Sequence, residues 1–360
     1  MTQGILAGHQ IEALAAAGAI IAPPFAPGQA QPASLDLRLG RRAFRMRASF
    51  LPQDRPVADR IGDLALHAID LTPGAVLETG CVYLCEVLET LALPPDVAAA
   101  ANPKSSTGRI DVFTRVICDR AREFDQIGAG YHGPLYAEIS PRTFPVLART
   151  GSRLAQARFR RGAARLDDAA HRALHAREKL VASAEPSIAG GVAVSVDLAG
   201  FDVAGLVGWR ARRHTGLIDV DQIGAYAARD FWEPVHASAA RELILDPGEF
   251  YILASKEAVR VPPDHAAEMT PFDPLVGEFR VHYAGFFDPG FGAAEAGGAG
   301  ARAVLEVRSH DVPFILEDGQ IVGRLVYEAM AERPRMLYGA GLNSNYQAQG
   351  LKLSKHFREV

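Results

Sequence analysis

One short segment in the first half of the chain has residue types that could bind an anion. Residues 104–109, KSSTGR, place Lys104 and Arg109 at the two ends of a run of three hydroxyls and a glycine. Such a segment can turn its hydroxyls and backbone N–H groups towards one anion. From local chemistry alone, an ordinary polar turn is the simpler interpretation, so the segment by itself assigns no function.

Motifs that would assign several other chemistries are missing from the sequence. It has no GxxxxGK[ST] phosphate loop, no GxSxG nucleophile elbow, no HExxH and no zinc-deaminase pattern of H-x-E with P-C-x-x-C. Cys81, Cys85 and Cys118 are the only cysteines, and no His or Cys cluster completes a set of four ligands. We therefore expect buried thiols, no disulfide framework and no protein-bound metal.

The composition is that of a globular protein with more than one domain. The chain has 360 residues, of which 48% are hydrophobic and 22% charged, and its formal net charge is −4. This length favours two domains, and the charge argues against a nucleic-acid partner. The N-terminal segment lacks a signal-peptide pattern, and no run of 18 apolar residues occurs. We expect a cytoplasmic protein with no membrane partner.

Short sequence motifs of the first half of the chain recur in the second half. SLDL at 34–37 recurs as SVDL at 195–198, PPD at 94–96 recurs at 262–264, and YAEI at 136–139 recurs as VLEV at 304–307. Two further pairs keep the same order along the chain: Pro73-Gly74 with Pro247-Gly248, and ARF at 157–159 with GRL at 323–325. The order indicates an internal duplication. It also makes Glu138 and Glu306 equivalent residues of the two copies.

Each copy is predicted to consist of short strands after one helix. Alternation with a period of two in VYLCEVLET (82–90), FYILASKEAVRV (250–261) and ARAVLEVRS (301–309) is typical of strands with one buried face. Pro and Gly interrupt these runs at short intervals, as in an all-β sandwich or barrel. Helices are expected at 8–18 and 165–183, the second as a solvated helix that joins the copies.

Taken together, the motifs resemble the dCTP deaminase family of the dUTPase-like fold, in its long two-copy form. The motifs that carry the resemblance are SLDLRLG at 34–40, KSSTGR, AGFFDPGF at 284–291 followed by Leu305-Glu306, and a Y-x-x-Q-G tail at 346–350. The resemblance implies a mainly β protein of duplicated dUTPase-like β-barrel or jelly-roll domains with short helices. It also implies hydrolytic deamination of dCTP to dUTP and ammonia in pyrimidine deoxynucleotide metabolism.

The two copies retain different halves of the family's site. In the first copy, residues 128–130 are GAG where the second copy has DPG, and Phe124 stands where the second copy has Ala284. In the second copy, TPFDPL at 270–275 replaces KSSTGR. Since the family's halves come from neighbouring subunits, we predict one composite site that needs both halves. The sequence leaves open whether one chain or two chains build it.

The resemblance also implies roles in the reaction at C4 of cytosine. Glu306 would take a proton from water and return it to the leaving amine, with Glu138 as the alternative catalytic glutamate. Ser105 would bind the water or the base, and Arg109 would stabilise developing negative charge. Ala284 would leave space for the water.

Other residues are implied to bind substrate. Asp288 would bind the sugar hydroxyl, and Tyr346 in the tail would pack on the deoxyribose. The remaining predicted substrate-binding residues are Lys104, Ser106, Phe291, Gln349 and Lys352, of which Gln349 and Lys352 would meet phosphate oxygens. No cofactor is expected on the protein, and Mg²⁺ would arrive on the triphosphate of the substrate.

We divide the chain into four segments. Residues 1–162 form the first copy, 163–190 a helical linker that begins the second, 191–342 the second copy, and 343–360 a nucleotide-binding tail. Two other functions stay open: a bifunctional enzyme that also cleaves dUTP to dUMP, and a non-catalytic dNTP-binding protein. The expected small-molecule partner is dCTP, and we expect the protein to form a homo-oligomer.

Overall fold

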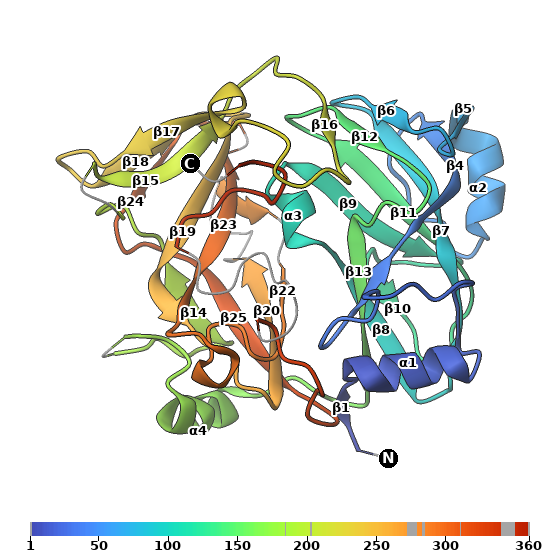
Figure 1. Cartoon of the computed structure of the whole chain (residues 1–360), viewed down its shortest axis with the longest axis horizontal. Helices are drawn as coiled ribbons and strands as arrows, with labels where there is room; N and C mark the ends of the chain where they lie inside the picture. Colours follow the sequence, from blue (N-terminus) through green and yellow to red (C-terminus); the bar gives the residue numbers. More distant parts are fainter. Residues whose placement is uncertain are drawn as a thin grey trace. The chain divides into compact units, whose positions relative to one another are not determined.

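The computed structural model describes residues 2–183, 185–201, 204–271, 279–282, 285–309, 311–339 and 350–358. They form two units, each built mainly from β-strands, as the sequence predicts (Figure 1). Unit 1 contains Met1–Ala163 together with His214–Tyr226 and Ser354–Glu359, and unit 2 contains Ala164–Arg213 and Ala227–Leu353. Two segments distant in sequence thus join the first half of the chain.

Unit 1 contains three sheets. The first sheet has the order β5(Ala65–Asp70), β4(Leu39–Met46), β7(Val82–Ala92), β11(His132–Pro141) and β9(Val112–Cys118), and β2(Ile20–Ile21) also pairs with β7. The second has the order β1(Gly4–Ile5), β13(Ala155–Arg161), β8(Val97–Pro103) and β10(Gln126–Ile127), and β3(Leu35–Leu37) also pairs with β13. The third has the order β16(Ile218–Asp219), β12(Val146–Ala148) and β6(Ala75–Leu77). All pairs except β12–β16 are antiparallel.

The described residues of unit 2 also form three sheets, and their strands pair antiparallel. The first sheet has the order β17(Trp232–His236), β15(Leu206–Ala211), β19(Phe250–Val259), β23(Ala301–Ser309) and β21(Phe279–His282). The second has the order β14(Val192–Ser195), β25(Ile321–Ala329), β20(His265–Pro271) and β22(Phe286–Phe287). The third pairs β18(Glu242–Leu245) with β24(Phe314–Glu317).

The strand order of unit 2 repeats that of unit 1. The series β5-β4-β7-β11-β9 corresponds to β17-β15-β19-β23-β21, and β13-β8-β10 corresponds to β25-β20-β22. The repeated order supports the predicted duplication. Glu138 lies on β11, between β7 and β9. Glu306 lies on β23, between the equivalent strands β19 and β21.

Alternating hydrophobicity predicted three of the long strands correctly. The three alternating runs form β7, β19 and β23. In β7, positions of high and partial burial alternate towards the end of the strand, because successive side chains leave the pleat on opposite faces.

The helices are shorter than predicted. The first is α1(Gly8–Ala16), and α4(Asp168–Glu178) replaces the expected helix at 165–183. Asp167 starts α4 by accepting the backbone N–H of Ala170 on its side chain, and Lys179 ends it in the left-handed region at φ 54°. Within the part of the chain that the structure describes, no helix is long and apolar enough to cross a membrane.

Two further α-helices and two 3₁₀ turns complete the described elements: α2(Val57–Leu64), α3(Ser105–Gly108), Ala228–Asp230 and Ala294–Ala296. Cys85 and Cys118 are buried, whereas Cys81 is only half-buried, so the prediction of buried thiols is wrong for Cys81. Burial raises the pKa of Cys85 to about 12 and that of Cys118 to about 11.

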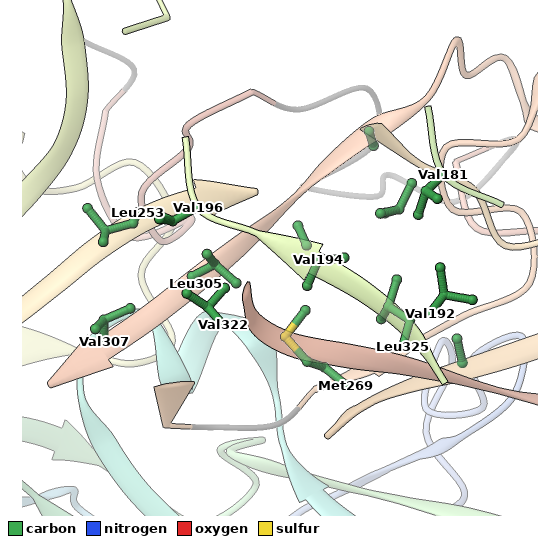
Figure 2. Packing of buried hydrophobic residues seen from close by; sticks show 14 of the residues in the cluster. Val181, Val192, Val194, Val196, Leu253, Met269, Leu305, Val307, Val322 and Leu325 are labelled. Carbon is green, nitrogen blue, oxygen red and sulfur yellow. The ribbon is translucent and has the colours of Figure 1, made fainter. Parts of the chain in front are cut away.

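The core of unit 2 holds β23 in place. Val194 of β14, Leu305 of β23 and Leu325 of β25 gather in one cluster and are fully buried (Figure 2). Burial of each such side chain stabilises the folded state by about 1.5–3 kcal/mol. The strand that carries Glu306 is therefore fixed by packing on the apolar side of its sheet.

Candidate active site

The KSSTGR segment forms a single helical turn at the end of β8. Lys104 precedes the turn in an extended conformation, α3 covers Ser105–Gly108, and the Arg109 N–H donates to the Ser105 carbonyl at 3.0 Å. Ser106 and Arg109 are buried, with exposed fractions of 6% and 4%, and Ser105 is half-buried. The predicted polar segment is thus part of the packed structure of unit 1.

Lys104 lies in a cluster of charges beside this turn. Its ammonium pairs with Asp36, the aspartate of the SLDL motif on β3, and Arg153 lies 3.6 Å from the same carboxylate. Burial lowers the pKa of Lys355, and the positive charges of Lys104 and Arg153 lower it further. Cations outnumber carboxylates around Asp36, so an anionic group could replace part of the Asp36 contact.

The DPGF motif of the second half forms a tight turn in unit 2. The Phe291 N–H donates to the Asp288 carbonyl at 3.1 Å, and Gly290 adopts φ +98°. A Cβ at Gly290 would lie 2.9 Å from the Leu337 Cβ, so the turn requires glycine there. Asp288 itself is half-buried.

Phe291 packs inside unit 2. It is 5% exposed, and its ring contacts the rings of Phe287 and Tyr338 with centroids 5.1 Å and 5.7 Å away. These contacts give the ring a structural role in the turn. A contact between Phe291 and substrate stays a prediction.

The equivalent turn of unit 1 has the same backbone and different chemistry. The Tyr131 N–H donates to the Gly128 carbonyl at 3.2 Å, and Gly130 adopts φ +70°. Because Gly128 stands where the second half has Asp288, this turn offers no carboxylate. The predicted loss of the acidic residue has therefore left the turn conformation unchanged.

Glu306 lies in the five-stranded sheet of unit 2, on a strand that is paired on both sides. It sits on β23, opposite Ile252 of β19 and His282 of β21, and is 6% exposed. A carboxylate at this depth is held apart from bulk water. The position therefore suits a group that exchanges a proton with one bound molecule.

Glu138, the equivalent glutamate of unit 1, is held by an arginine. It lies opposite Arg115 of β9, and the Arg115 guanidinium donates to its Oε1 from Nη2 at 2.5 Å and from Nε at 3.2 Å. The Ser49 hydroxyl donates to the same oxygen at 3.1 Å. Glu138 is 2% exposed and the Arg115 side chain is 23% exposed, so the ion pair is partly buried.

Aromatic rings complete this ion pair. The Arg115 guanidinium carbon lies 3.5 Å from the centre of the Phe124 ring and 4.6 Å from that of Phe113. Phe124 stands two residues before β10, as Ala284 stands two residues before β22 in the sequence. An arginine and an aromatic ring thus fill the space beside the carboxylate of the first half.

Three of the predicted site residues lie outside the residues that the structure describes. Ala284, Tyr346 and Gln349 belong to segments that the structure does not describe. Lys352 is half-buried. A hollow of about 670 Å³ in unit 1, between β4, β5 and β7, contains none of the predicted residues.

Sequence reasoning missed three residues next to the predicted site. Arg115 pairs with Glu138, and Ser354 and His356 contact the KSSTGR turn or its neighbours. The signal for Arg115 was available only through the register of β9 and β11, which brings residues 23 positions apart face to face.

Comparison with known proteins gives family matches over almost the whole chain. Residues 2–163 match the family model of the 2'-deoxycytidine 5'-triphosphate deaminase N-terminal domain, and residues 167–357 match that of the C-terminal domain. A crystal structure described as 2'-deoxycytidine 5'-triphosphate deaminase from Agrobacterium tumefaciens is 59% identical, with a TM-score of 0.88. It aligns over 93% of this chain and 100% of that chain.

Curated relatives match over shorter stretches. A dCTP deaminase of Halorubrum lacusprofundi is 32% identical over 134 residues, which cover 36% of this chain and 63% of the relative. A protein of Clavibacter michiganensis named "dCTP deaminase, dUMP-forming" is 32% identical over 160 residues, which cover 43% of this chain and 75% of the relative. In the first of these, the match thus spans less than two thirds of the relative's length.

Proposed function

Because the chain belongs to the 2'-deoxycytidine 5'-triphosphate deaminase family, we propose that it hydrolyses dCTP to dUTP and ammonia in pyrimidine deoxynucleotide metabolism. The observation that carries the proposal is the contrast between the two equivalent glutamates. Glu138 is locked by Arg115, whereas Glu306 shares its half with the DPGF motif. One half of the chain has therefore kept the acidic part of the site, and the other has kept the KSSTGR turn.

The proposed reaction uses side chains of the protein as acid, base and anion stabiliser. Water adds to C4 of the cytosine while the Glu306 carboxylate takes its proton. The same proton passes to the exocyclic amine, and the C4–N bond breaks to release ammonia. The second hydrogen of the water ends on N3 as the C4 carbonyl of uracil forms. Ser105 hydrogen-bonds the water or the base, and Arg109 stabilises the negative charge that develops on the ring.

The contacts of Glu138 support the choice of Glu306. Oε1 of Glu138 already accepts hydrogens from Arg115 and Ser49, and Phe124 stacks on the same guanidinium. Substrate and water would have to displace this partly buried pair, which would leave a charge uncompensated. Glu138 is thus proposed to stabilise unit 1 and to take no part in proton transfer.

Substrate binding is proposed to need residues of both halves, from one chain or from two copies. Lys104, Ser106 and Lys352, with Gln349, are proposed to contact the triphosphate, which arrives with Mg²⁺ as part of the substrate. Asp288 is proposed to accept the 3'-hydroxyl hydrogen of the sugar, and Tyr346 to pack on the deoxyribose. Homo-oligomeric assembly and a cytoplasmic location stay predictions.

A second candidate is the bifunctional reaction that ends at dUMP. It is favoured by one observation, the name of the Clavibacter michiganensis relative, which is dUMP-forming. The same Glu306 chemistry would come first, and hydrolysis of the dUTP phosphates would follow.

Product analysis tests both candidates. Purified protein is incubated with dCTP and Mg²⁺, nucleotides are separated by anion exchange, and ammonia is measured. One dUTP per ammonia supports the proposal, and dUMP with pyrophosphate supports the bifunctional candidate. dTTP, which has no exocyclic amine, is the control and should release no ammonia. Unchanged dCTP would contradict both candidates and leave a dNTP-binding protein as the remaining function.

A further inference from the structure

The last described residues of the chain belong to unit 1, next to a segment inserted between β15 and β17. The Gly224 N–H donates to the Lys355 carbonyl at 3.0 Å, and the Arg358 N–H donates to the Tyr226 carbonyl at 2.9 Å. The rings of Tyr226 and Phe357 meet edge to face, with centroids 6.4 Å apart. The contacts fix residues 354–358 as an ordered part of this unit.

The first residue of this docked segment holds the KSSTGR turn. Within the turn, the Lys104 carbonyl accepts from Thr107 and Gly108, and the Ser105 carbonyl accepts from Arg109. The Ser106 carbonyl instead accepts from the hydroxyl of Ser354 at 2.8 Å. A one-turn helix leaves most of its carbonyls without intrahelical partners, so a side chain from elsewhere is needed to satisfy a buried one.

The neighbour that contacts the Ser354 hydroxyl is His356. Its Nδ1 lies 2.8 Å from the Ser354 Oγ, and its Nε2 lies 3.0 Å from the Val220 carbonyl. A carbonyl only accepts, so Nε2 carries the one N–H of the neutral ring and Nδ1 is an acceptor. Ser354 has one hydrogen to donate, and Nδ1 and the Ser106 carbonyl therefore share it.

We propose that Ser354 is a positioning residue for the reaction at the KSSTGR turn. It fixes the peptide between Ser106 and Thr107, and so the directions of the neighbouring Ser105 and Arg109 side chains. The inference rests on the proposed function, in which those two side chains contact the reacting groups. Ser354 is 2% exposed and His356 is 2% exposed, so the contact is made inside the protein.

Ser354→Ala tests the proposal. Loss of the hydroxyl should lower kcat for dCTP by roughly 10–100-fold, because small misplacements of reacting groups are costly, and should change KM far less. Tyr226→Phe is the matched control. It removes the hydrogen bond that the Asp219 N–H donates to the Tyr226 hydroxyl at 2.7 Å in the same docked region, and does not touch Ser106. Its kcat should stay near the wild-type value.

Three results would overturn the proposal. A Ser354→Ala enzyme with unchanged kcat would show that the contact positions nothing. Equal losses in Ser354→Ala and Tyr226→Phe would show that docking in general, and not the Ser106 contact, sets the rate. A wild type without dCTP turnover would refute the proposed function, and this inference with it; the first two results refute the inference alone.

A second pair of variants decides the case if Ser354→Ala does not fold. Asparagine at 356 can place an amide N–H near the former Nδ1, whereas glutamine reaches the place of Nε2. His356→Asn should therefore lose less kcat than His356→Gln. The reverse order would mean that the Val220 contact matters more than the Ser354 contact, and would overturn the proposal.

Discussion

At the scale of single residues, the contacts of Glu138 with Arg115 support a structural role for the glutamate of the first half. The carboxylate keeps its place in the strand and gains a fixed cation on the neighbouring strand. A glutamate in an alternating strand was easy to find in the sequence. Its partner was not, because only the register of two strands tells which residue of β9 lies opposite.

Removing the cation should destabilise the protein more than removing both charges. Arg115→Met leaves the buried carboxylate uncompensated and should lower the free energy of unfolding by about 3 kcal/mol. This value is at the lower end of the costs for breaking a buried ion pair, because the Arg115 side chain is partly exposed. Glu138→Gln combined with Arg115→Met should recover part of that loss. Urea unfolding of the two single variants and the double variant measures the coupling. Additive losses would contradict a direct ion-pair role.

Ser105 and Arg109 carry the second prediction at this scale. Ser105→Ala and Arg109→Ala should each lower kcat by at least roughly 10²-fold, as expected when a contact to the transition state is lost. Thr270→Ala is the control, since it removes a half-buried hydroxyl near the corresponding place of unit 2. Near-normal turnover in both KSSTGR variants would remove the turn from the site.

At the scale of elements, what the sequence predicts well is what depends on local pattern. Alternation identified β7, β19 and β23, and the helix before each copy was found with its ends misplaced. The short strand β16 and the docked residues 354–358 were not predicted. Both are held by partners far away in sequence, such as Val146 for Ile218 and Ser106 for Ser354.

The docked C-terminal segment should respond to acid. Burial lowers the pKa of His356 to about 4, and the charge of Lys355 lowers it further. The hydrogen bond to the Val220 carbonyl and the charges of Asp221 and Asp219 oppose this shift. Because the unfolded chain holds this proton more tightly, the stabilising effect of the neutral ring is complete above about pH 6.5 and is lost as the pH falls towards 4.

The size of this effect is on the order of 3 kcal/mol over that range. The measurement is the free energy of unfolding of the wild type and of His356→Asn at several pH values between these limits. The wild type should lose stability more steeply than the variant, which lacks the titrating ring. Parallel pH profiles would contradict a buried neutral His356.

At the scale of the whole molecule, the two halves share one strand order and contain different motifs. Both have the same turn before the equivalent of β11 or β23, with glycines at φ +70° and φ +98°. The sequence could predict the duplication and the division of motifs, because both depend on residue identity. It could not predict which groups contact one another, because that depends on register and on packing.

The measurement that tests this division most directly compares Glu306→Gln with Glu138→Gln in kcat and in dCTP affinity. Glutamine keeps the shape of glutamate and cannot take a proton, so Glu306→Gln should lower kcat by roughly 10²–10⁴-fold and still bind dCTP. Glu138→Gln should lose stability and keep turnover close to wild type. If Glu138→Gln is the inactive enzyme and Glu306→Gln the active one, the assignment of the catalytic glutamate to the second half is wrong.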